Sequence, residues 1–158
     1  AGLKKFDNAL KNYLDAINIK PDFSDAYNNI GHLYNQNGNY NKAIDYFKKS
    51  ISIKENDIQS HNNLANAYFK LKQFEKANFH YNRALNINPN FAEAYNNLGN
   101  IQRQLGNLDN AIDLFLKAIE INPNLVESYN NIGVVYHDLK NLEAAEKYLQ
   151  KSIYTGKT

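Results

Sequence analysis

The sequence contains no cysteine, no methionine and no tryptophan, and it has only three prolines in 158 residues. Without cysteine the chain can form no disulfide, no thiolate metal site and no cysteine nucleophile. No apolar run approaches the roughly 18 residues that a membrane-spanning helix needs, and no secretory signal pattern is visible. We therefore expect a protein of a reducing, intracellular compartment, cytoplasmic or nuclear, with no membrane partner.

An excess of charge of one sign is also lacking. The chain carries 18 Lys and Arg against 16 Asp and Glu, a net charge of +2. The most basic stretch, residues 58–91, spreads its cations around its helices rather than gathering them in one stripe. Because a nucleic-acid interface needs gathered positive charge, we predict no nucleic-acid partner. Hydrophobic residues make up 43% of the chain, which is sufficient for a packed core.

The sequence is rich in one repeated pattern. The tetrapeptides at 27–30, 61–64, 95–98 and 129–132 all read aromatic or His, then Asn-Asn, then Ile or Leu, and they begin 34 residues apart. A fixed period of this length is typical of a solenoid in which each unit packs only on its neighbours. We predict four repeats, numbered from position 1 in each: 24–57, 58–91, 92–125 and 126–158. Residues 1–23 form a partial repeat before them.

The apolar pattern within each repeat predicts two helices, A and B. Positions 4, 7, 8 and 11 form one apolar stripe at helical spacing, and positions 20, 24 and 27 form a second. Between the helices, Gly38 and Gly106 occupy position 15, where a glycine supplies the left-handed conformation that ends a helix. Lys72 and Lys140 occupy the same position in the other two repeats, at a cost of up to about 1 kcal/mol each.

These residues resemble the tetratricopeptide-repeat signature, which the third repeat shows with Tyr95, Leu98, Gly99, Ala111, Phe115 and Pro123. The resemblance covers the whole chain. It implies an all-α, right-handed superhelical solenoid of antiparallel helix pairs, with helix A of each repeat lining a concave groove. Because the partial repeat has helix B only and the fourth repeat has no capping helix, we expect a slice of a longer array or end-to-end self-association.

Paired asparagines at positions 5 and 6 recur in every repeat, although neither position belongs to an apolar stripe and asparagine is a mediocre helix former. We expect both to face outward into the groove that the resemblance implies. Since an asparagine amide both donates and accepts, it can bracket a peptide unit. The predicted peptide-binding residues are the position-6 asparagines Asn29, Asn63, Asn97 and Asn131, the position-5 asparagines Asn28, Asn62, Asn96 and Asn130, and their neighbours Asn66, Asn100, His32 and Arg103.

The position-6 series resembles the repeat array of the O-linked N-acetylglucosamine transferases, in which an asparagine ladder holds extended protein substrates by their backbone. The likeness is to the array only. It implies a protein–protein interaction module whose groove binds extended peptide segments. Two alternatives stay open: the substrate-recognition region of such an enzyme whose catalytic domain lies outside this chain, and a structural spacer in a larger assembly that binds no peptide.

Other kinds of site find little support. The carboxylate clamp of chaperone-binding repeats uses Lys at position 5 and Asn at 9, Asn at 6 of the next repeat, then Lys at 2 and Arg at 6. Starting from the second repeat, this chain supplies only Asn66 and Asn97 of that set, so every cation is missing. The four histidines show no metal-ligand spacing. We predict no catalytic residue, no metal and no cofactor, and hence no enzyme in this segment.

Overall fold

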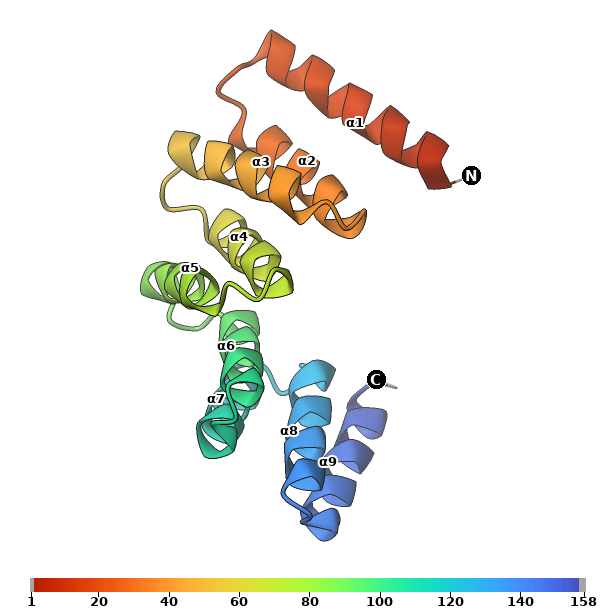
Figure 1. The fold of residues 1–158 in the computed structure, drawn as a ribbon, viewed down its shortest axis with the longest axis vertical. Coiled ribbons are helices and arrows are strands. Elements are labelled where there is room, and N and C mark those ends of the chain that lie inside the picture. The colour runs from red at the N-terminus through yellow and green to blue at the C-terminus, as the bar shows by residue number, and fades with distance from the viewer. Residues whose placement is uncertain (1, 157–158) are drawn as a thin grey trace. The chain divides into compact units, whose positions relative to one another are not determined.

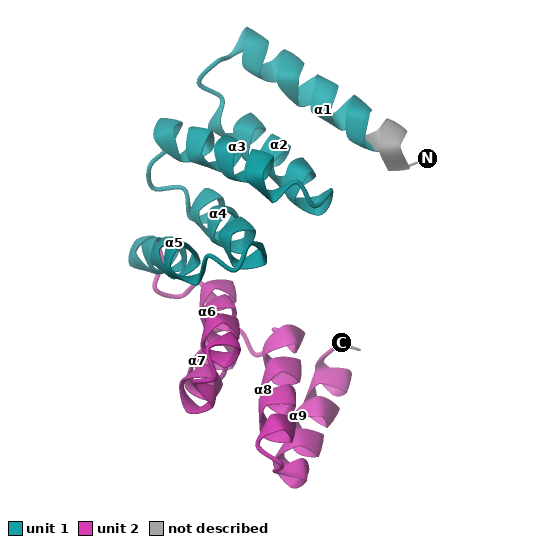
Figure 2. Ribbon diagram, in the orientation of Figure 1, with its two compact units in different colours: residues 1–87 teal, residues 88–158 magenta. Residues whose placement is uncertain are grey.

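The computed structural model describes the backbone of residues 2–156 and the side chains of residues 6–156, and this part of the chain folds into helices with no strand. It forms two compact units, residues 1–87 and 88–158 (Figure 1, Figure 2). The first unit holds α1 (Gly2–Ile19), α2 (Ser24–Gln36), α3 (Tyr40–Ile53), α4 (Ile58–Lys70) and α5 (Phe74–Ile87). The second holds α6 (Ala92–Gln104), α7 (Leu108–Ile121), α8 (Val126–Asp138) and α9 (Leu142–Thr155).

Helices that are consecutive in the chain pack on one another within each unit. In the first unit α1 packs on α2, α2 on α3, α3 on α4 and α4 on α5, and in the second the series runs from α6 to α9. Contacts also join α2 to α4 and α6 to α8, the first helices of neighbouring helix pairs. This nearest-neighbour packing confirms the predicted all-α solenoid. The repeat boundaries themselves stay a prediction, and residues 1, 157 and 158 lie outside the described residues.

Within a helix pair, glycine at position 8 permits a very close approach. A Cβ atom on Gly31 would lie 2.6 Å from the ring of Phe47, and one on Gly99 would lie 2.6 Å from the ring of Phe115. Both phenylalanine side chains are fully buried. In these two helix pairs the phenylalanine ring of helix B therefore rests directly on the backbone of helix A, and a larger residue in place of Gly31 or Gly99 must displace it.

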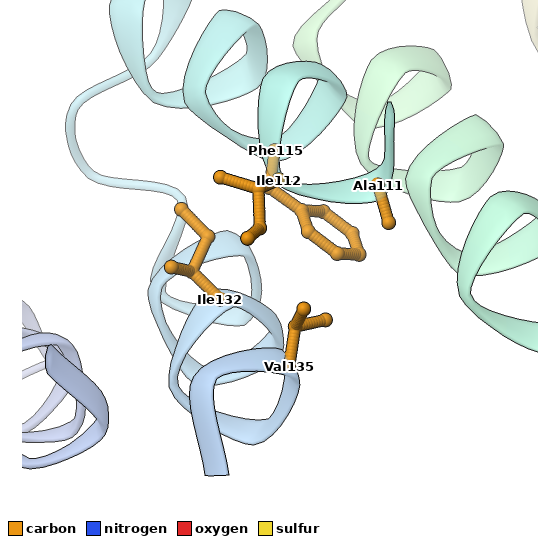
Figure 3. Close-up of a cluster of buried hydrophobic side chains, with 5 residues drawn as sticks. All are labelled: Ala111, Ile112, Phe115, Ile132 and Val135. Atoms are coloured by element: carbon orange, nitrogen blue, oxygen red, sulfur yellow. The ribbon is translucent and has the colours of Figure 1, made fainter. Parts of the chain in front are cut away.

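Between helix pairs, apolar side chains from the second helix of one pair meet those of the next pair. In the second unit Ala111, Ile112 and Phe115 of α7 pack with Ile132 and Val135 of α8, and Figure 3 shows this cluster. Burying one large apolar side chain contributes about 1.5–3 kcal/mol. The spacing of three and four residues along each helix places these residues on one face, as the sequence pattern predicts.

The turns between the helices of a pair have the predicted left-handed conformation. The φ angles are +76° and +82° at Gly38 and Gly106, and +57° and +61° at Lys72 and Lys140. The amide after Lys72 then donates from Gln73 N to the carbonyl of Tyr68 at 2.9 Å, which closes the end of α4. The lysines therefore adopt a conformation that favours glycine.

Candidate functional site

Asn96, at position 5 on α6, is the centre of a buried hydrogen-bond network in the second unit. Its side chain is 8% exposed. Its Oδ1 accepts one bond from Asn131 Nδ2 at 2.9 Å and another from Ser128 Oγ at 3.0 Å, both on α8. Its Nδ2 donates to Asn97 Oδ1 at 3.4 Å. Asn96 is thus bonded to two position-6 asparagines, one on its own helix and one on the next helix A.

The first unit contains the same relationship between neighbouring repeats. Asn63 Nδ2 on α4 donates to Asn28 Oδ1 on α2 at 3.1 Å. In both units the position-6 asparagine of one repeat therefore donates to the position-5 asparagine of the preceding repeat, 35 residues earlier. The serine three residues before the position-6 asparagine has a different partner in the two units. Ser128 donates to Asn96, whereas Ser60 pairs with Ser50 Oγ at 2.8 Å and not with Asn28.

The expectation that both asparagines of each pair face outward is wrong for Asn62 and Asn96. Asn62 is 7% exposed and Asn96 is 8% exposed, whereas Asn28 is half-buried and Asn130 is exposed. The polarity pattern predicted an outward position because asparagine lies off the apolar stripe. For Asn96 the neighbouring helix supplies hydrogen-bond partners, and a buried amide that is bonded carries little penalty.

The position-6 asparagines remain accessible. Asn29 is exposed, and Asn63, Asn97 and Asn131 are half-buried. The bonds from Asn63 and Asn131 to the preceding repeat use one N–H of each amide. Each of these two amides keeps its carbonyl oxygen and a second N–H for another partner. The bonds also fix the orientation in which those groups are presented.

The neighbouring residues predicted to line the groove have mixed roles. Asn66 Oδ1 accepts a hydrogen bond from the hydroxyl of Tyr81 at 2.6 Å. Burial raises the pKa of Tyr81, so the phenol stays a donor, and Asn66 links α4 to α5. His32 is exposed and its Nε2 lies 2.9 Å from Gln36 Nε2. Asn100 is half-buried on α6.

Arg103 is also half-buried, and its Nε is buried with no hydrogen-bond partner. One other side-chain atom in the described part shares that condition, Asn35 Oδ1. Ser128, which donates to Asn96, is not among the site residues predicted from the sequence. A signal for it existed, because position 3 carries Ala or Ser in every repeat and all four residues are fully buried: Ala26, Ser60, Ala94 and Ser128.

His61, which stands where the other repeats have tyrosine, is buried and 3% exposed. Its Nε2 lies 2.9 Å from the carbonyl oxygen of Glu55, which can only accept, so this nitrogen carries the hydrogen. Its Nδ1 then accepts from His80 Nδ1 at 3.1 Å. Burial, with smaller contributions in the same direction from the neighbouring His61, Lys48 and Arg83, lowers the pKa of His80 to about 4.

Two further observations bear on the kind of site. In the described part of the chain, no group of three or more His, Asp or Glu side chains is arranged to hold a metal ion. Among the same residues, no helix combines the length and apolar character needed to cross a bilayer. Hydrogen bonds of asparagine and serine side chains join the first helices of neighbouring pairs within each unit.

Helix pairs stacked on their neighbours define the class of protein as a helical-repeat scaffold. Models of the tetratricopeptide repeat match residues 22–90, 92–125 and 114–147, and a model described as the TPR repeat matches residues 3–38. The chain is built from tetratricopeptide repeats. This fold is typical of non-catalytic interaction scaffolds, and the narrower likeness to the transferase arrays stays a prediction. Comparison with curated proteins returned no match.

Solved structures share the fold over most of the chain. A crystal structure of MamA is 26% identical with a TM-score of 0.81, covering 99% of this chain and 91% of MamA. YrrB, described as a TPR protein with an unusual peptide-binding site, is 27% identical with a TM-score of 0.70, covering 98% and 79%. The first TPR of Spaghetti (RPAP3), bound to the HSP90 peptide SRMEEVD, is 27% identical with a TM-score of 0.69, covering 74% and 93%. All three share the repeat fold with this chain, and the descriptions of two of them name a peptide-binding site or a bound peptide.

Proposed function

We propose that the chain binds extended peptide segments by their backbone, through the position-6 asparagines of its A helices. The observation that carries the proposal is the bond from Asn131 to Asn96, with its counterpart from Asn63 to Asn28. Each bond holds a half-buried amide in one orientation while leaving it one donor and one acceptor. The position-5 asparagines hold these amides and do not themselves contact the peptide.

The chemistry of an extended peptide fits such amides. Its backbone offers N–H and C=O groups whatever its side chains, and an oriented amide can meet one of each. A hydrogen bond contributes about 1 kcal/mol net, so a few such bonds give modest affinity with low sequence specificity. Fixing the amides before binding reduces the entropy that association must overcome. The peptide need not present its terminus, because the chain lacks the cations of a carboxylate clamp.

Two of the similar structures support this class of ligand. The description of YrrB names a peptide-binding site, and the RPAP3 repeat domain was solved with a bound peptide. We carry over to this chain only the class, a peptide segment. The alternative of a structural spacer predicts that the chain binds no free peptide.

The test combines Asn29→Ala, Asn63→Ala, Asn97→Ala and Asn131→Ala in one variant. The probe is a capped fluorescent peptide of about twelve Gly, Ser and Ala residues, since backbone recognition needs no particular side chain. Binding is followed by NMR shift titration, which detects weak complexes. We expect the fourfold variant to lose about tenfold or more in affinity, the equivalent of roughly 1.4 kcal/mol.

A matched control removes four exposed asparagines from the B helices, by changing Asn41, Asn78, Asn82 and Asn110 to Ala. It alters composition and helix propensity to the same extent and should bind like the wild type. Circular dichroism checks that both variants keep their helices. Unchanged binding by a folded fourfold Asn→Ala variant would refute the proposal, and no binding by the wild type would favour the spacer.

A further inference from the structure

The two buried polar atoms without a partner occupy the same place in their repeats. Asn35 Oδ1 belongs to α2 in the first unit, and Arg103 Nε belongs to α6 in the second. Both residues stand at position 12, the last turn of helix A. Folded proteins pair nearly all buried polar atoms, so the side chains at position 12 of these two repeats are only partly satisfied by the described residues.

Arg103 lies on the face of α6 that carries the asparagine network. Asn96, Asn100 and Arg103 are separated by four and three residues, which aligns them along one side of the helix. Asn96 bonds to α8 from this side. Seven residues of helix separate Asn96 from Arg103, a rise of about 10 Å. An extended peptide covers that distance in about three residues.

The surroundings of Arg103 leave its charge without a counter-ion. No ion pair joins it to any described residue. The register that pairs Asn96 with Asn131 places Asp138 of α8 level with it, yet Asp138 lies near His137 Nδ1, at 3.9 Å, and forms no ion pair with Arg103. A guanidinium that is partly removed from water is best stabilised by a carboxylate, which can accept two of its N–H groups at once.

We infer that Arg103 receives the side-chain carboxylate of an Asp or Glu in the bound peptide, about three residues from the backbone unit held at Asn131. The inference rests on the proposed function and adds a side-chain preference to it. The preference belongs to the second unit, because the equivalent residue in the first, Asn35, carries no positive charge. If ordered water alone satisfies Arg103, no preference exists.

The experiment uses two peptides of about twelve Gly, Ser and Ala residues, one with a single central Glu and one with Gln. Both are acetylated and amidated, so that the glutamate side chain is the one carboxylate available. We expect the wild-type chain to bind the Glu peptide about five- to tenfold more tightly at low salt. Arg103→Gln should remove this preference. Arg103→Lys should keep part of it.

Lys70→Gln is the matched control, since it removes one exposed cation from the last turn of another helix A and should leave the preference intact. Equal binding of the two peptides by the wild type, or a preference that survives Arg103→Gln, overturns the role of Arg103 alone. Failure of both peptides to bind the wild type overturns the proposed function and this inference together. A preference lost in Arg103→Gln but kept in Lys70→Gln supports both.

Discussion

The side-chain amide of Asn131 donates to the carbonyl oxygen of Asn96 at 2.9 Å, across 35 residues of sequence and between two A helices. Asn63 and Asn28 form the same bond at 3.1 Å in the other unit. This relationship divides the paired asparagines into two roles. In these two pairs the residue at position 5 accepts the bond and the residue at position 6 donates it.

The first prediction concerns the stability that Asn96 contributes. Asn96→Ala leaves the hydroxyl of Ser128 and an amide N–H of Asn131 without their acceptor in a buried place. We expect a loss of about 1–3 kcal/mol in the free energy of unfolding. Asn130→Ala, at the same repeat position but exposed, should change it by less than about 0.5 kcal/mol. Urea unfolding followed by circular dichroism compares them, and equal effects would contradict the orienting role.

A second prediction follows from the contact between Gly99 and Phe115. A Cβ on Gly99 would lie 2.6 Å from the ring, so Gly99→Ala must displace a fully buried side chain. Overpacking of this kind costs about 1–3 kcal/mol, which outweighs the gain of up to about 1 kcal/mol in helix propensity. We expect a lower melting temperature, against no change for Asn110→Ala on the exposed side of α7. A higher melting temperature for Gly99→Ala than for the wild type would contradict this prediction. It would show that α6 and α7 move apart at little cost.

A third prediction concerns the turn lysines. Lys72 has a φ of +57° and Lys140 a φ of +61°, which glycine adopts without strain. Lys72→Gly and Lys140→Gly should each raise the free energy of unfolding by up to about 1 kcal/mol. Lys70→Gly, two residues earlier within α4, should lower it by a similar amount because it lies in regular helix. Denaturant unfolding of the three variants measures these changes. A loss of stability in Lys72→Gly would contradict the claim that the positive φ of Lys72 is strained.

A fourth prediction concerns pH and His80. Its pKa in the folded chain is about 4, below the ordinary histidine value of 6.5. Between these values the unfolded chain binds the proton more readily, so stability is full above about pH 6.5 and falls as the pH drops toward 4. With allowance for partial solvent exposure, the loss amounts to about 1–2 kcal/mol.

The measurement compares wild type with His80→Phe, which cannot titrate. Unfolding free energies are taken at several pH values from 4 to 7, and the difference in slope isolates this histidine from the carboxylates. We expect the wild type to lose more stability than the variant across that range. Parallel curves would place His80 in a water-exposed environment instead.

Much of the fold could be predicted because its causes are local and periodic. The helix pairs follow from apolar stripes at three- and four-residue spacing, and the left-handed turns follow from glycine at position 15. Even the two lysines at that position have the positive φ that the pattern predicts. The repeats strengthen the prediction of the fold, because the same apolar pattern recurs in each of them.

The candidate site was less predictable, because burial of an asparagine depends on what its neighbour offers. Position 5 looks equally polar in all repeats, yet Asn96 is buried and Asn130 is exposed. Asn66 looks like a groove residue, yet Tyr81 occupies its oxygen. The local sequence pattern predicts neither the burial of Asn96 nor the bond to Asn66, since both depend on a partner from another helix.

The sequence by itself determined that this chain is an all-α solenoid and that two asparagines recur on each helix A, since periodicity and composition are properties of the chain alone. Only the tertiary structure decided which of these asparagines are buried and which of them bond to the neighbouring repeat. It also decided that Arg103 keeps an unpaired donor beside them. The physical reason is that hydrogen-bond satisfaction is a property of pairs, and these pairs form only when one repeat packs on the next.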